Sequence, residues 1–248
     1  MFSKKIEFLT HDHYLDLKED YPVPIKTNIP QWYKKLIHTP ENRTVKGCMP
    51  FLDTLTTGYL LKNPSAFKLR HNVINPKTGK KDSFYQAGTI SDGIIQGVGL
   101  NINQTVPSLH GPQQLEGSPL VEKNRKFPIY KIMNPWIIKT PPGYSCLFVP
   151  PLNNADDRFS IIPGIVDTDT FDSEINFPIV VNGDKYESIE TIIEKGTPYV
   201  QVIPFQRDSW KMEIKEIDAK ELRKRRISFG LRMHNIYKNL FWRKKSWR

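Results

Sequence analysis

Four carboxylates follow one another closely in the second half of the chain: Asp167, Asp169, Asp172 and Glu174. Carboxylate oxygens are the ligands that Ca²⁺ and Mg²⁺ prefer, and one loop can gather acids at such spacing around a single cation. The glycine that an EF-hand loop requires is missing here. Acidic residues are also common in turns, because their side chains bond to nearby backbone groups. The sequence therefore leaves two interpretations, a divalent-cation site and an ordinary acidic turn, and predicts no other cofactor.

Histidines are absent from the part of the chain where a barrel-borne metal site would draw its ligands. A cupin-type enzyme needs two histidines and a carboxylate that converge on one metal. The chain has six histidines, and none lies between residues 129 and 217. His110 precedes that block and is near enough to it in sequence to be a candidate for lining a pocket. His11-Asp12-His13 has metal-like spacing but lies in the N-terminal segment.

Signatures of nucleophilic catalysis and phosphate binding are also missing. Ser145 lacks the second glycine of a G-x-S-x-G turn, and the chain has neither a P-loop nor a dinucleotide fingerprint. We therefore assign no catalytic residue. Trp136 and Tyr144 lie in an aromatic and proline-rich stretch that could form the rim of a ligand groove or part of the core. The core is favoured for Trp136, because Ile137 and Ile138 follow it.

The elements that must position these residues are predicted to be mainly strands. Short apolar segments rich in β-branched and aromatic residues alternate with prolines and glycines, which is typical of antiparallel β proteins. A short helix is expected near residues 29–37, with Asn28 as its N-cap. The expected strands are 58–61, 93–100, 129–140, 145–149, 160–166, 175–181, 186–193, 199–205 and 210–217.

The charge of the chain is concentrated at one end. The chain has 36 Lys and Arg against 26 Asp and Glu, and 11 of the basic residues with only one of the acids lie in residues 220–248. Residues 1–219 then hold 25 bases and 25 acids, a net charge of zero. We call residues 220–248 the basic arm. All 20 prolines precede it, which favours a helix there.

The basic arm is predicted to form one amphipathic helix over residues 218–248. Asp218 can cap it, with Glu221 in a capping box. A stripe of five apolar residues at helical spacing should dock it on the body: Leu222, Phe229, Met233, Ile236 and Leu240. Its candidate contact residues are Arg223, Lys224, Arg225, Arg226, Trp242, Arg243, Lys244 and Lys245. The first expected partner is an acidic protein surface or a second copy; nucleic acid ranks second and a membrane surface last.

Several motifs resemble a family of uncharacterised proteins of tailed phages and bacteria. They are Pro135–Ser145 (PWIIKTPPGYS), Gly164–Asp169 (GIVDTD), Ile175–Pro178 (INFP) and Gly196–Phe205 (GTPYVQVIPF). The resemblance covers most of residues 22–215 and brings no established activity with it. A weaker similarity in layout links the block to cupin-like double-stranded β-helices.

These observations predict a mainly β protein of three parts. Residues 1–128 should wrap a jelly-roll or cupin-like sandwich over residues 129–217, and residues 218–248 should pack on it as a basic helix. The favoured function is a non-catalytic binding or assembly protein of phage type. A cupin-type enzyme for a small molecule and a nucleic-acid-associated protein are the alternatives. With no leader or spanning segment in the sequence, we expect the cytoplasm of the producing or infected cell, or the virion.

Overall fold

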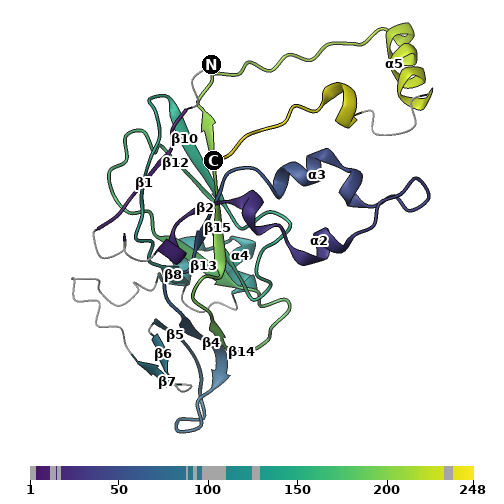
Figure 1. Cartoon of the computed structure of the whole chain (residues 1–248). Coiled ribbons are helices and arrows are strands. Elements are labelled where there is room, and N and C mark those ends of the chain that lie inside the picture. The colour runs from purple at the N-terminus through teal and green to yellow at the C-terminus, as the bar shows by residue number, and fades with distance from the viewer. Residues whose placement is uncertain are drawn as a thin grey trace.

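A computed structural model of the chain describes residues 4–11, 15, 18–87, 89–91, 94–96, 110–124, 129–231 and 237–248. Its described part is mostly β, with several antiparallel sheets and short helices (Figure 1). The largest sheet has five strands in the order β12-β10-β15-β3-β2. These strands are β12 (Gly164–Val166), β10 (Tyr144–Val149), β15 (Pro198–Gln206), β3 (Tyr59–Lys62) and β2 (Val23–Pro24).

The central strand of this sheet is β15. Its run of apolar residues predicts a strand covered on both faces, and Tyr199, Val200 and Val202 are indeed buried. It pairs antiparallel with β10 on one side and with β3 on the other. Strand β3 belongs to the N-terminal segment, so both halves of the chain build the same sheet.

Smaller antiparallel sheets complete the body. One has the order β11-β13-β8, another β14-β4-β5, and two are the pairs β1-β9 and β6-β7. Their strands are β11 (Phe159–Ile161), β13 (Phe177–Val181), β8 (Tyr130–Ile132), β14 (Ile189–Ile193), β4 (Phe67–Ile74), β5 (Lys81–Ala87), β1 (Glu7–Leu9), β9 (Ile137–Lys139), β6 (Thr89–Ser91) and β7 (Ile94–Gln96).

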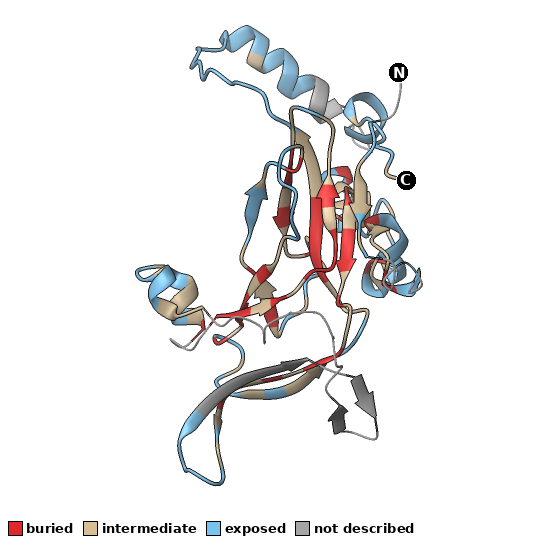
Figure 2. Cartoon of the chain, turned by 90° about the vertical axis from the view of Figure 1, so that its left-hand side faces the viewer, coloured by how far each residue is buried: buried red, intermediate tan, exposed pale blue. Residues whose placement is uncertain are grey.

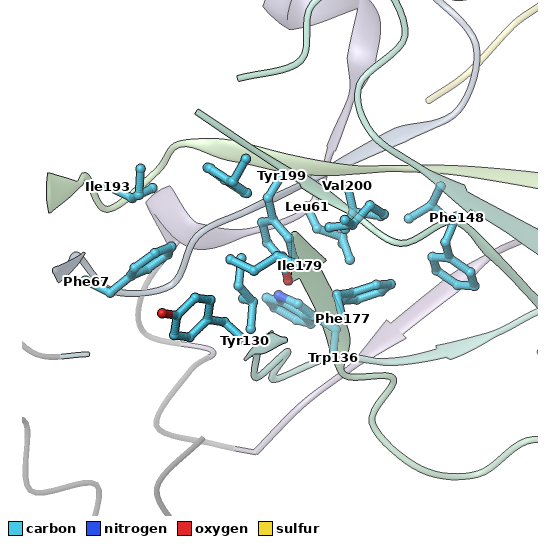
Figure 3. Packing of buried hydrophobic residues seen from close by; sticks show 14 of the residues in the cluster. Leu61, Phe67, Tyr130, Trp136, Phe148, Phe177, Ile179, Ile193, Tyr199 and Val200 are labelled. Carbon is cyan, nitrogen blue, oxygen red and sulfur yellow. The ribbon is translucent and has the colours of Figure 1, made fainter. Parts of the chain in front are cut away.

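One hydrophobic core joins the five-stranded sheet to the β11-β13-β8 sheet. Phe148 of β10 and Phe177 of β13 face each other across it, with ring centroids 5.4 Å apart. Phe177 also meets Tyr199 of β15 edge to face, at 5.7 Å. Figure 3 shows Trp136 beside Phe177 in this cluster. Strands from both sheets therefore cover one shared core, which holds the body together.

The helices of the body are short. They are α2 (Gln31–Lys35), α3 (Met49–Thr54) and α4 (Pro119–Lys123), with 3-10 turns η1 (Lys18–Asp20), η2 (Ile25–Asn28), η3 (Val45–Gly47) and η4 (Pro112–Leu115). The predicted helix near residues 29–37 is thus confirmed as α2, but Asn28 does not cap it. Pro30 takes the N-cap position, because Asn28 already belongs to η2.

One predicted strand is wrong. Residues 210–217 alternate apolar and charged side chains, but no sheet receives them, and β15 ends at Gln206. The other expected strands between 129 and 206 are present, with 129–140 and 160–166 each divided into two. Of the expected strand 93–100, only β7 falls within the described residues.

The basic arm is also not one helix. Helix α5 covers Ala219–Leu231 and a π-helical turn, η5, covers Tyr237–Phe241. Residues 242–248 continue without helix. No helix in the described part of the chain is long and apolar enough to cross a membrane.

Replacing Trp136 tests the core. The side chain is 4% exposed and meets Tyr21 edge to face, with centroids 5.6 Å apart. Trp136→Ala should lower the free energy of unfolding by about 3–5 kcal/mol, measured by urea denaturation. Ile37→Ala, at an exposed position, is the control and should stay within about 0.5 kcal/mol of the parent. Equal stability of both variants would place Trp136 outside the core.

Candidate protein-contact surface

A cluster of polar side chains lies where β15 ends. The Arg207 guanidinium donates from Nη1 to Asp169 Oδ1 at 2.8 Å and approaches Asp167 Oδ1 at 3.2 Å. Ser145 Oγ donates to the same Asp167 oxygen at 2.6 Å. The backbone N–H of Gly143 donates to Asp169 Oδ2 at 2.8 Å. We call these residues the Arg207 cluster.

The surrounding backbone explains why these groups meet. Antiparallel pairing places Tyr144 at the start of β10 opposite Gln206 at the end of β15. Arg207 therefore follows directly beside the turn that precedes β10, and its N–H donates to Gly143 O at 2.8 Å. The acidic loop follows β12, on the other side of β10. Three segments that are distant in sequence are thus fixed at one end of the sheet.

The cation of Arg207 lowers the pKa of Asp169 to about 2, and the Gly143 N–H bond acts in the same direction. Asp169 is nearly enclosed, with its side chain 6% exposed. A hydrogen-bonded carboxylate of this kind is held in its charged form over the whole range near neutrality. Its role in the structure is to fix Arg207.

The two remaining acids of the loop have other partners. Asp172 forms an ion pair with Lys139, and Glu174 lies 3.9 Å from His11 Nε2. The four acids are therefore divided among three basic side chains, Arg207, Lys139 and His11. Within the described residues, no three His, Cys, Asp or Glu side chains are grouped so that they could hold a metal ion. Asp12 and His13 of the His11 motif lie outside those residues.

The pH dependence of stability should report the Arg207 cluster. The pKa of Asp169 is depressed from an ordinary value of about 3.9, so its stabilising effect is present above about pH 4 and is lost as the pH falls towards 2. Asp169→Asn should therefore lower the melting temperature at pH 7, and the difference from the parent should shrink between pH 4 and about 2. Thermal unfolding followed by circular dichroism measures it.

The matched control for this prediction is Asp184→Asn. Asp184 is an exposed acid of a turn, and its replacement should change the free energy of unfolding by less than about 0.5 kcal/mol. A difference between Asp169→Asn and the parent that stayed constant from pH 7 to pH 2 would contradict the ionic role of Asp169.

The three pocket candidates have separate surroundings. Trp136 is in the core, as described above. His110 forms an isolated bridge with Ile129, and its Nδ1 lies 2.9 Å from Gln114 Oε1. Tyr144 donates from its hydroxyl to Gln206 Oε1 at 3.0 Å and carries the Lys4 ammonium 4.1 Å above its ring. Among the described residues, these three side chains therefore do not share one set of contacts.

The chain leaves the body after Arg207 as an extended segment. We call residues 208–218 the connecting segment. Trp210, Met212 and Ile214 are 89%, 84% and 86% exposed. Glu213 and Lys215 form an ion pair at 3.0 Å, as residues on one side of an extended chain can. None of residues 208–217 forms a backbone hydrogen bond with another described residue.

This exposure is unusual for side chains of such size. Burial of a large apolar side chain stabilises a structure by about 1.5–3 kcal/mol relative to its exposed state. Trp210, Met212 and Ile214 are at alternate positions, and alternate side chains of an extended segment lie on the same side of it. Larger apolar patches on a protein surface commonly mark a contact site for another molecule.

Helix α5 follows the connecting segment and stands apart from the body (Figure 2). Asp218 caps it as predicted, accepting from the N–H groups of Lys220 and Glu221 at 2.8 and 3.0 Å. Glu221 instead pairs with Arg225 one turn later. The predicted cations of α5 all lie exposed to solvent: Arg223, Lys224, Arg225 and Arg226.

The arm returns to the body through residues 242–248, which we call the tail. Trp242 Nε1 donates to both Asp53 oxygens, at 3.1 and 3.2 Å, and Lys245 forms an ion pair with the same carboxylate. The Trp247 ring meets Tyr59 edge to face at 5.9 Å. Tyr59 also donates from its hydroxyl to the backbone oxygen of Arg248 at 3.2 Å. Arg243 and Lys244, between these anchors, are exposed.

The structure describes the side chains of two of the five residues in the predicted docking stripe. The apolar stripe was expected to hold the arm, but Leu222 is only partly buried and Leu240 is 45% exposed. The side chains of Phe229, Met233 and Ile236 lie outside the described part of the chain. Among the described residues, the tail makes the side-chain contacts between the arm and the body, and Trp242 and Lys245, both predicted contact residues, bind Asp53.

Asp53 and Tyr59 are residues that sequence reasoning missed. Both are positioned by β15. Gln201 of β15 is buried and donates to Thr54 O and Thr57 O at 3.1 and 2.7 Å, which holds the turn after α3 against the sheet. Gly58 in that turn has φ +82° and lies so close that a Cβ would be 2.1 Å from Val202 O. The positions of Asp53 and Tyr59 follow from the pairing of β3 with β15, which the sequence alone does not give.

No model of a known protein family matches this chain, and no curated protein does.

Removing the Asp53 carboxylate should release the tail. Asp53→Ala deletes the acceptor of Trp242 and the counter-ion of Lys245, so the segment after η5 loses its polar anchor. Limited trypsin digestion should then cut at Arg243, Lys244 and Lys245 at least about tenfold faster, because cleavage follows the population of the open state. Asp184→Ala should leave the rate unchanged. An unaltered rate in Asp53→Ala would show that the tail is held by other contacts.

Proposed function

We propose that this chain is a non-catalytic assembly protein that uses its basic arm to contact an acidic protein surface. The observation that carries this proposal is the presentation of the arm. The arm leaves the body at the Arg207 cluster and returns at Asp53, so α5 is displayed on a loop held at both ends (Figure 1).

A loop that is held at both ends loses less conformational entropy on binding than a free tail does. Ordering a flexible segment at an interface consumes part of the binding free energy. Here the Arg207 cluster and the tail contacts restrict the segment before a partner arrives. The arm is thus prepared for a contact, which supports a binding role over a purely packing role for α5.

The charge of the arm supports an acidic partner. Arg223, Lys224 and Arg226 are exposed, and no ion pair of theirs with a described residue is present. Such a concentration of one charge speeds the encounter with an oppositely charged surface and suppresses contact with other cationic ones. The body, with a net charge of zero, would contribute little to this attraction.

The body serves as the scaffold in this proposal. Its two facing antiparallel sheets share one core, which supports a jelly-roll-like sandwich as the finer description of the fold. The resemblance to proteins of tailed phages and bacteria supports a phage-type assembly role, acting in the infected cell or the virion.

Neutralising α5 tests the proposal. The variant with Arg223, Lys224, Arg225 and Arg226 all changed to Gln keeps helix-forming side chains but removes four charges. Titration calorimetry with poly-glutamate, as a probe of acidic polypeptide, should show binding to the parent. Affinity should fall at least about tenfold in the variant, and steeply with salt in the parent. The control changes Lys18, Lys26, Lys34 and Lys35 of the body to Gln and should bind like the parent.

Two outcomes would overturn this function. Poly-glutamate binding unaffected by the α5 variant would place the contact elsewhere. Tight binding of a DNA duplex, with no binding of poly-glutamate at the same salt concentration, would favour nucleic acid as the partner of the arm.

A further inference from the structure

The five-stranded sheet has an exposed edge at β12. Among the described strands, it pairs with β10 only, and Ile165 at its centre is 63% exposed. An open edge presents unpaired backbone groups that another strand can use. A further strand could therefore pair with β12.

An apolar row leads across the outer face of the sheet to this edge. Leu147 of β10 lies opposite Ile165 in one pairing and opposite Ile203 of β15 in the other. Directly opposed residues share a face. The neighbours Cys146 and Phe148 are buried in the core, so the row Ile203, Leu147, Ile165 points to the other face. In the described part of the chain, no strand continues this row beyond Ile165.

The connecting segment has the pattern that would extend this row. Trp210, Met212 and Ile214 alternate with charged residues, as a strand with one apolar face requires. The backbone of residues 208–217 forms no hydrogen bond with other described residues. The chain therefore carries both an open strand edge and an unpaired strand sequence.

Within one chain, the connecting segment does not pair with β12. In the sheet order β12-β10-β15-β3-β2, the tail is anchored to Tyr59 of β3 and to Asp53 of α3, just before β3. β12 lies on the opposite side of β15. No sheet among the described residues receives the connecting segment, and Figure 1 shows it running from the end of β15 to α5.

We infer that the connecting segment of a second copy adds as a strand to β12. Met212 of the second copy would then lie beside Ile165 and continue the apolar row. A two-fold exchange satisfies both copies, since each donates one segment and accepts another. This inference rests on the proposed assembly function and names a second copy of the chain as the partner.

Charge selects the direction of the added strand. The acidic loop 167–174 begins directly after β12. Within the described part of the chain, Arg207 and Lys139 are the Lys and Arg side chains that pair with its four carboxylates. Helix α5 follows the connecting segment and carries the exposed cations. A donor that runs parallel to β12 places α5 of the second copy at this loop, where opposite charges meet.

Cysteine cross-linking tests the contact. In a Cys48→Ser background, Ile165→Cys and Met212→Cys are made as separate single variants and mixed under mild oxidation. The expected result is a covalent dimer that forms only in the mixture containing both. The matched control replaces Ile165→Cys with Ile74→Cys, at a residue 61% exposed on β4, and should give no specific dimer with Met212→Cys. Equal cross-linking of both pairs would overturn the inference.

The oligomeric state provides the second readout. Light scattering over a dilution series should show a monomer–dimer equilibrium for the intact chain. Ile165→Lys, a charge on the strand edge, should weaken the dimer about tenfold or more, whereas Ile74→Lys should not. A chain that stays monomeric at every concentration would overturn the inference. If that monomer still bound poly-glutamate through α5, the proposed function would stand without the strand exchange; if it bound none, both would fail.

Discussion

The side chain of Arg207 joins the end of β15 to the acidic loop after β12, and the course of the basic arm depends on this ion pair. Asp169 is nearly enclosed and is held as a carboxylate by Arg207 and by the Gly143 N–H. The pair fixes the point at which the connecting segment leaves the sheet. A second set of contacts, from Asp53 and Tyr59 to the tail, fixes where the arm returns.

This arrangement gives a physical account of the unpaired strand pattern at residues 210–217. An alternating sequence forms a strand only where a partner supplies backbone hydrogen bonds and an apolar surface. The described residues supply no such partner, because the backbone of residues 208–217 forms no hydrogen bond with any of them. Trp210, Met212 and Ile214 therefore stay exposed, and we propose that a second copy supplies the missing partner.

Local patterns predicted much of the fold. The apolar runs bounded by proline and glycine located β10, β13 and β15, and the N-cap chemistry located the start of α5 at Asp218. The β4–β5 hairpin was missed, although Phe67, Leu69 and His71 alternate with cations, because the basic and polar composition of that region hides the strand signal. The segment 210–217 shows the converse error: the pattern is correct for a strand, but pairing is decided by tertiary position.

The candidate surface was predictable in composition and not in geometry. Charge counting identified the basic arm, and its α5 cations are exposed. The anchors could not be read from the sequence, because Asp53 and Trp242 are 189 positions apart. Likewise, the spacing of Asp167, Asp169, Asp172 and Glu174 fits a divalent-cation site as well as it fits an ordinary acidic turn. The structure shows Arg207 beside Asp167 and Asp169, Lys139 beside Asp172, and His11 beside Glu174, a placement that the sequence alone does not give.

Hydrogen exchange of the intact chain, followed by mass spectrometry at low and at high protein concentration, tests this account most directly. The account predicts that the tail is protected at both concentrations, because its anchors lie within one chain. Residues 208–217 and 163–166 should exchange rapidly in dilute solution and should become protected together as the concentration rises. Exchange in these two segments that does not change with concentration, or protection of one without the other, would contradict it.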